Sequence, residues 1–192
     1  NVNQYTLCTG FDVSSSSFSS SFSLSSRQTQ PKGLTFNSNG TKMYIVGSDG
    51  TNIDEYNLGT AFTVTTSVYS QSFSVSAQDT NPTGIVFNND GSKMYIVGDT
   101  GDDINQYALS SVFDISTASF TQSFSVSAQE TSPEDVTFNS TGTKMFVIGR
   151  ATNAVKEYNL SIAFDISTSV FSQSFDVSAQ ETQSFGITFN SD

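Results

Sequence analysis

The sequence predicts an all-β protein, and specifically a β-propeller built of four-stranded antiparallel blades. One observation behind this prediction is an internal repeat: Tyr5, Tyr56, Tyr107 and Tyr158 follow one another at intervals of 51 residues, with no insertion or deletion between copies. The other is that each copy holds short apolar runs separated by turn sequences, without the 3.6-residue period of a helix. Four strands repeated head to tail are typical of propeller blades.

One complete repeat shows the four expected strands. The apolar runs Gly84–Asn88 and Lys93–Gly98 flank the turn Asn89–Gly91, as in a tight β-hairpin. Both runs are almost continuously apolar, so we expect these strands to be covered on both faces. A third strand is expected at Ile104–Leu109 and a fourth at Ser119–Ser127. The fourth run alternates apolar and polar residues, which predicts a half-solvated outer strand.

The chain of 192 residues is interpreted as a single propeller region, 1–192. Its repeats are a partial unit 1–32, the full units 33–83, 84–134 and 135–185, and a partial unit 186–192, about four units in all. The last copy lacks a counterpart of residues 142–153. We therefore expect the region to be part of a larger propeller, or of a multi-chain propeller in which a partner copy completes the blade. A closed ring with one distorted blade is the third alternative. Exposed strands in an incomplete blade predict self-association.

A family resemblance follows from one unit. The sequences PTGIVFNNDGSKMYIVG at 82–98 and DINQYAL at 103–109 resemble the blades of YVTN-type and lactonase-like β-propellers. The resemblance covers every unit and implies the propeller fold. It implies no particular function, because enzymes, binding proteins and structural proteins share this blade. The catalytic acids and histidines of lactonases are not carried over to this chain, which has no histidine.

Composition excludes several classes of partner. The formal net charge is −11, from 18 acidic and 7 basic residues, and no cluster of lysine or arginine exists. Nucleic-acid binding requires such a cluster, so it is not expected. No apolar run approaches the roughly 20 residues of a membrane helix, so membrane insertion is not expected either. Few lysines and abundant serine, threonine and asparagine favour an extracellular location, or the surface of a cell or particle.

One loop is a candidate calcium site. The loop after the second strand differs between units, and in one unit it carries Asp99, Asp102 and Asp103. Carboxylate oxygens are the ligands that Ca²⁺ prefers. The alternative is an exposed acidic turn. The cluster occurs in only one unit, which favours this alternative. No other cofactor is expected.

Three sequons for N-glycosylation occur, at Asn39, Asn139 and Asn159. Asn39 lies on a hairpin turn, where a glycan would find room. The alternative is chance, since a chain so rich in serine, threonine and asparagine produces sequons without selection.

Repeated positions are interpreted as packing positions. The tyrosines of the 51-residue ladder could form a sugar-stacking platform, but their strict repetition favours packing between blades. Asp54–Glu55 corresponds to Asn105–Gln106 and to Lys156–Glu157 in the next units. A position that changes between acid, amide and lysine is typical of a solvated strand edge.

No catalytic constellation is recognised: the chain has no histidine base, no Gly-x-Ser-x-Gly and no phosphate-binding glycine loop. The near-identical copies suggest a unit constrained by packing. The sequence therefore predicts an extracellular structural or interaction module, of fibre, surface or adhesin type, without enzymatic activity, whose partners are further blades or other copies. The alternative is a propeller that binds a glycan or another small ligand through the loops after the second strand.

Overall fold

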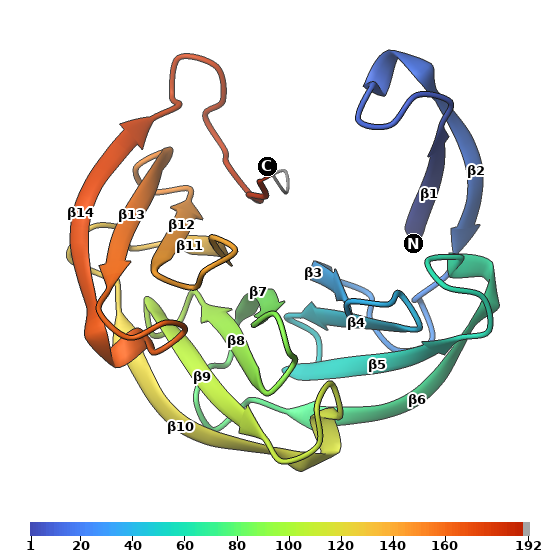
Figure 1. Cartoon of the computed structure of the whole chain (residues 1–192), viewed down its shortest axis with the longest axis horizontal. Helices are drawn as coiled ribbons and strands as arrows, with labels where there is room; N and C mark the ends of the chain where they lie inside the picture. Colours follow the sequence, from blue (N-terminus) through green and yellow to red (C-terminus); the bar gives the residue numbers. More distant parts are fainter. Residues whose placement is uncertain (190–192) are drawn as a thin grey trace.

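The computed structural model describes residues 1–189, and it confirms an all-β propeller arrangement. Three complete four-stranded antiparallel blades follow one another along an arc (Figure 1). Blade 1 comprises β3 (Pro31–Phe36), β4 (Lys42–Gly47), β5 (Asn52–Leu58) and β6 (Ser67–Ser74). Blade 2 comprises β7 (Pro82–Phe87), β8 (Lys93–Gly98), β9 (Asp103–Leu109) and β10 (Ala118–Ser125). Blade 3 comprises β11 (Pro133–Phe138), β12 (Lys144–Gly149), β13 (Ala154–Leu160) and β14 (Ser169–Asp176).

Partial units lie at the two ends of the arc. The N-terminal hairpin consists of β1 (Val2–Leu7) and β2 (Ser16–Phe22), which pair only with each other. The C-terminal segment, residues 184–189, lies beside β11 without forming a regular strand, and the two ends flank an open sector of the arc (Figure 1). The predicted unit boundaries at 83/84 and 134/135 fall inside β7 and β11, so they divide the repeat and not the sheets.

The predicted strands agree with blade 2 to within two residues at each end. The strand at Lys93–Gly98 is as expected, whereas β7 starts two residues early at Pro82 and β10 ends two residues early at Ser125. The sequence did not predict the short 3-10 helix between the third and fourth strands of each unit. These helices are η1 (Val13–Ser15), η2 (Val64–Thr66), η3 (Ile115–Thr117) and η4 (Ile166–Thr168).

Glycine allows the blades to approach one another at the centre of the arc. A Cβ atom on Gly33 would lie 3.0 Å from the Cα of Gly84, and one on Gly84 would lie 3.0 Å from the Cα of Asp135. Real Cβ atoms rarely make such close contacts with backbone, so a side chain at either glycine would push the inner strands apart. The repeated Pro-x-Gly sequence is therefore a packing requirement of the inner strand.

The hydrophobic core lies between blades. Tyr44 and Tyr107 belong to the cluster between blades 1 and 2, and Tyr95 and Tyr158 belong to the cluster between blades 2 and 3. All four side chains are buried. Of the tyrosines in the 51-residue ladder, Tyr56, Tyr107 and Tyr158 are buried as predicted, whereas Tyr5 is 58% exposed. Each blade thus uses both faces of its inner strands, as the continuous apolar runs predict.

The interpretation of Asp54–Glu55 as a solvated edge is wrong, because both side chains are buried. They lie on β5, which pairs with β4 on one side and with β6 on the other. The Glu55 carboxylate accepts hydrogen bonds from Lys42 at 2.8 Å and from Gln71 at 2.9 Å. The Glu55 position is therefore part of a polar network inside the blade, and in blade 2 Gln106 accepts the corresponding bond from Gln122 at 3.1 Å.

Among residues 1–189, no helix is long and apolar enough to cross a membrane.

Candidate functional site

The inner edges of the blades surround a cavity of about 390 Å³, which we call the central cavity. It is lined by the middle of each inner strand, at residues 34–35, 85–86 and 135–137, and by residues 186–188 of the C-terminal segment. Most of these residues are apolar or carry hydroxyl groups. Within the described residues, Asp135 is the one charged residue in the lining.

Asp135 occupies the position at which the other units have glycine, namely Gly33, Gly84 and Gly186. Its carboxylate accepts a hydrogen bond from the backbone N–H of Ile187 at 3.0 Å and from that of Val136 at 2.9 Å. Burial raises the pKa of Asp135 to about 6, although these two backbone donors act in the opposite direction. A carboxylate with a pKa near neutrality in a cavity is typical of a functional site.

Glu134 precedes Asp135 and occupies the variable position of Pro-x-Gly, where blades 1 and 2 have Lys32 and Thr83. The Glu134 carboxylate is buried and forms an ion pair with the guanidinium of Arg150, at the end of β12. Burial raises the pKa of Glu134, and the positive charges of Arg150 and Lys32 oppose this change. Because Pro133 of β11 pairs with Gly149 of β12, these groups meet at the start of β11, beside Asp135. We call this polar cluster the mouth; its side chains are not among those that line the cavity.

Arg150 links this mouth to the neighbouring loop. Its guanidinium lies 3.3 Å from the Ser132 hydroxyl and 4.0 Å from the Asp99 carboxylate, and it lies 5.7 Å from the centre of the Phe185 ring. The Ser132 hydroxyl in turn donates to Asp99 at 2.8 Å. The mouth therefore combines two cationic side chains with several carboxylates, and Glu134 and Asp99 hold Arg150 in place.

The three aspartates of the predicted calcium site have separate roles in the structure. Asp99 accepts hydrogen bonds from Ser132 and from the Asn81 amide, at 2.8 and 2.9 Å. Asp103 accepts one from the Asn105 amide at 2.7 Å, and Asp102 adopts a positive φ of 49°. Within residues 1–189, no group of three acidic, histidine or cysteine side chains is arranged to hold a metal ion. The calcium site stays a prediction to which the geometry adds no support.

Two other buried acids in this region stabilise loops. Asp79 accepts the backbone N–H of Gly101 at 3.0 Å, and Glu130 accepts those of Ala151 and Thr152 at 3.0 and 3.2 Å. These carboxylates replace missing backbone acceptors in the loop after the second strand. Both carboxylates are therefore engaged in hydrogen bonds that hold the loops.

The sequons lie in different environments. Asn39 is exposed on the turn between β3 and β4, and Asn159 is exposed on β13. Asn139 is half-buried, and its amide donates to the hydroxyls of Thr141 and Thr143 at 2.9 and 3.2 Å. Glycosylation stays a prediction, as does the extracellular location.

Sequence reasoning missed Glu134 and Asp135. The available signal was the replacement of Pro-x-Gly by Pro133-Glu134-Asp135 in a single unit. Asp135 is a charged residue in place of a packing glycine in one copy of a strict repeat, which marks this copy as a candidate site.

Neither a protein-family model nor a curated protein matches the chain. Solved structures do match it. A candidate 6-phosphogluconolactonase from Bacteroides fragilis is similar over 77% of this chain and 39% of its own, with 16% identity and a TM-score of 0.56. The periplasmic gluconolactonase of Pseudomonas aeruginosa is similar over 76% and 39%, with 14% identity and a TM-score of 0.50. A functionally unknown protein from Desulfotomaculum acetoxidans is similar over 91% and 49%, with 16% identity and a TM-score of 0.56.

These comparisons confirm the resemblance to lactonase-like propellers at the level of the fold. The chain spans less than half the length of each of these three structures. They also correct the functional prediction. An extracellular structural module without catalytic activity was inferred from the strict repeat, but similar structures are named as lactonases, and one unit places Asp135 in the cavity where the other units have glycine. The exclusion of enzymatic activity was wrong.

Proposed function

We propose that the protein hydrolyses a small cyclic ester in the central cavity, with Asp135 as the general base. The observation that carries this proposal is the carboxylate of Asp135, which replaces a packing glycine and lines the cavity among apolar and hydroxyl-bearing residues. The names of the similar structures support the choice of a lactone as substrate class.

The chemistry follows from the ionisation of Asp135. With a pKa raised to about 6, the side chain is mostly ionised at pH 7 and is a stronger base than an ordinary aspartate. In the proposed reaction it takes a proton from a water molecule whose oxygen attacks the ester carbonyl carbon. The ring C–O bond then breaks, and the released alkoxide receives that proton, so that the carboxylate is regenerated and the product is a hydroxy acid.

Positive charge at the mouth would stabilise the negative charge that develops on the carbonyl oxygen. Lys32 and Arg150 supply it, both close enough to Glu134 to lower its pKa. Arg150 is held by Glu134, which makes it a fixed positive group, whereas Lys32 is exposed. We therefore assign the more mobile contact with substrate to Lys32.

The test compares two substitutions of aspartate by asparagine. Asp135→Asn removes the base, and Asp90→Asn alters a hairpin turn at the opposite end of the strands, where asparagine also suits the turn. Acid release from a panel of sugar and aliphatic lactones is followed by pH-stat, above the spontaneous rate. We expect Asp135→Asn to lower the rate at least 100-fold and Asp90→Asn to leave it unchanged.

The pH profile gives a second criterion. The rate of the unmodified protein should rise with pH through an inflection near 6, where Asp135 loses its proton. No rate above background with any lactone, or full activity in Asp135→Asn, would overturn the proposal.

A further inference from the structure

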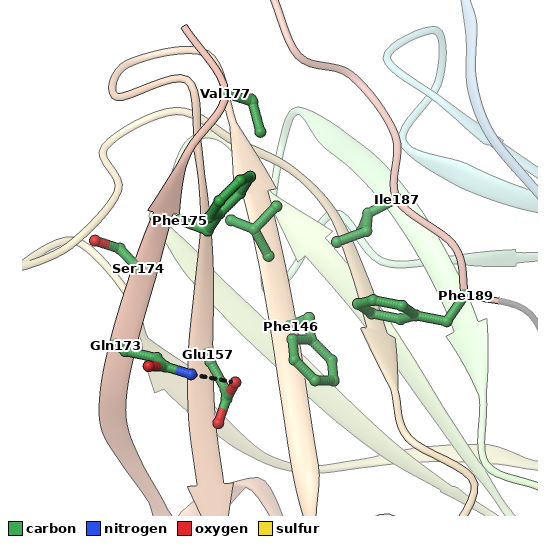
Figure 2. Close-up of a pocket in the computed structure, with 9 residues that line it drawn as sticks. Phe146, Glu157, Gln173, Ser174, Phe175, Val177, Ile187 and Phe189 are labelled. Carbon is green, nitrogen blue, oxygen red and sulfur yellow. Dashed lines mark hydrogen bonds between the residues drawn. The ribbon is translucent and has the colours of Figure 1, made fainter. Parts of the chain in front are cut away.

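The face of blade 3 that is turned toward the open sector is apolar, and together with Ile187 and Phe189 of the C-terminal segment it lines a cavity of about 500 Å³. Figure 2 shows Phe146, Phe175, Val177 and Phe189 directed into this cavity, with Glu157 and Gln173 at its edge. Phe175 is 71% exposed within the described structure. In blades 1 and 2 the corresponding face is covered by the next blade, and those two covered faces show what fits here.

An aromatic contact joins successive units three times. The fourth strand of each unit carries a phenylalanine that meets a tyrosine on the third strand of the next unit, edge to face. The ring centres are 5.4 Å apart for Phe22 and Tyr56, 5.7 Å for Phe73 and Tyr107, and 5.5 Å for Phe124 and Tyr158. Within residues 1–189, Phe175 meets no tyrosine of a following unit. Tyr5 contacts Phe18 of its own hairpin and meets no phenylalanine of a preceding unit.

A polar contact accompanies it at both complete interfaces. The Lys42 ammonium donates to the Phe113 carbonyl at 3.0 Å, and the Gln71 amide donates to the Asp114 carboxylate at 2.8 Å. Lys93 and Gln122 repeat these bonds with Phe164 and Asp165, at 2.8 and 2.7 Å. The next residues, Ile115 and Ile166, are fully buried.

The N-terminal hairpin presents the same corner uncovered. Phe11 has a φ of 59°, against 57° for both Phe113 and Phe164, and Asp12 caps η1 as Asp114 caps η3. Phe11 is 87% exposed, Val13 is 80% exposed and Tyr5 is 58% exposed. The corner thus has the backbone conformation of its counterparts. It lacks the face of a preceding blade, and it also lacks the first hairpin of its own unit, to which Phe113 in blade 2 is bound through the Gly91 carbonyl.

We propose that the N-terminal hairpin of a second copy of this chain docks, head to tail, on the open face of blade 3. Phe175 would contact Tyr5 of the second copy, Lys144 would donate to its Phe11 carbonyl, and Gln173 would donate to its Asp12 carboxylate. Val13 would be buried as Ile115 and Ile166 are. None of these contacts involves the second strand of the blade that the two copies share.

The curvature of the arc favours a second copy over closure within one chain. The hairpin and blade 3 are separated by the open sector in Figure 1. Superposition on the Desulfotomaculum structure uses 91% of this chain but 49% of that one. Two copies would therefore cover about the whole of that one structure, and a closed two-copy ring would use both open ends of each copy.

The test uses exposed residues, so that the variants fold. Val13→Asp blocks the hairpin, Phe175→Ser blocks the open face, and Val68→Asp is the matched control, since Val68 is a 67% exposed valine on the outer strand β6. Circular dichroism and the melting temperature should match the unmodified protein. In sedimentation velocity between 1 and about 100 μM, we expect the unmodified protein and Val68→Asp to associate to the same extent. Val13→Asp and Phe175→Ser should each sediment as monomers.

Mixing the two blocked variants tests the orientation. The Val13→Asp variant keeps an unmodified blade 3 face, and the Phe175→Ser variant keeps an unmodified N-terminal hairpin. Their mixture should therefore form a one-to-one dimer, although neither variant associates alone. The proposal is overturned if the unmodified protein is monomeric over the whole range, if either blocked variant still associates alone, or if the mixture stays monomeric. Loss of lactone hydrolysis in Asp135→Asn bears on the proposed function and leaves this outcome unchanged.

Discussion

Substitution of Tyr95 by phenylalanine tests how the blades are held together. The Tyr95 side chain is completely buried, and its hydroxyl donates to the Phe164 carbonyl of the next blade at 2.7 Å. The same carbonyl receives a second hydrogen bond from the Lys93 ammonium at 2.8 Å. Removal of the hydroxyl therefore leaves the acceptor with one donor, and the ring keeps its packing.

The expected cost follows from this arrangement. A net hydrogen bond contributes about 1 kcal/mol, and an unpaired buried acceptor costs about 1–3 kcal/mol. Tyr95→Phe should lower the free energy of unfolding by about 1 kcal/mol, because the Phe164 carbonyl stays paired. The double variant Lys93→Met/Tyr95→Phe leaves that carbonyl without either donor, so its cost should exceed the sum of the two single costs by about 1–2 kcal/mol.

Urea unfolding followed by far-ultraviolet circular dichroism measures these costs, with an unchanged slope as the check that the unfolding reaction is the same. Tyr69→Phe is the control, because the Tyr69 hydroxyl makes no hydrogen bond within the described residues and its loss should be neutral. A cost above about 3 kcal/mol for Tyr95→Phe would refute the reasoning, as would additive costs in the double variant.

Two further substitutions test the turn and the cavity mouth by the same urea assay. Gly91→Ala should cost about 2 kcal/mol or more, because Gly91 has a φ of 73° and a Cβ there would lie 2.3 Å from the Phe113 ring. Gly59→Ala, with no atom closer than 3.6 Å, should be nearly neutral. Arg150→Met should cost about 2 kcal/mol at pH 8, allowing for its partial exposure, because it leaves Glu134 charged and buried. The loss should shrink toward pH 4, where Glu134 takes up a proton; an equal loss at both pH values would contradict this.

The blade could be predicted from the sequence because each of its requirements is local and repeated. The turn at Asn89–Gly91 and the apolar run Lys93–Gly98 predict the hairpin, and the structure places β8 at the same bounds. The 3-10 helices escaped prediction because they are three residues long and carry no periodic signal. Three of the four helices have an aspartate cap, such as Asp114, which becomes recognisable only when its bond to the Ser116 N–H is seen.

The burial of Asp54 and Glu55 could not be predicted, because it depends on neighbours that the repeat pattern does not describe. Gln28, from the loop before blade 1, covers Asp54 with a hydrogen bond at 3.2 Å, and Gln71 covers Glu55. Variation between acid and amide suggests solvent exposure when only the sequence is considered. In the structure, variation between Glu55 and Gln106 is allowed because either side-chain oxygen accepts the bond from the glutamine of the fourth strand.

Departures from the repeat are the more informative positions in this molecule. A residue that packs between blades is the same in every blade. When one blade has a different residue at such a position, the groups around that residue also differ. Asp135 replaces a glycine that elsewhere permits close approach of the inner strands, and its carboxylate instead faces the C-terminal segment and the cavity. Phe146 replaces Tyr44 and Tyr95, whose hydroxyls reach a carbonyl of the following blade. Both changes lie in blade 3, which connects the proposed hydrolytic site on its inner strand to the proposed docking face on the side turned toward the open sector.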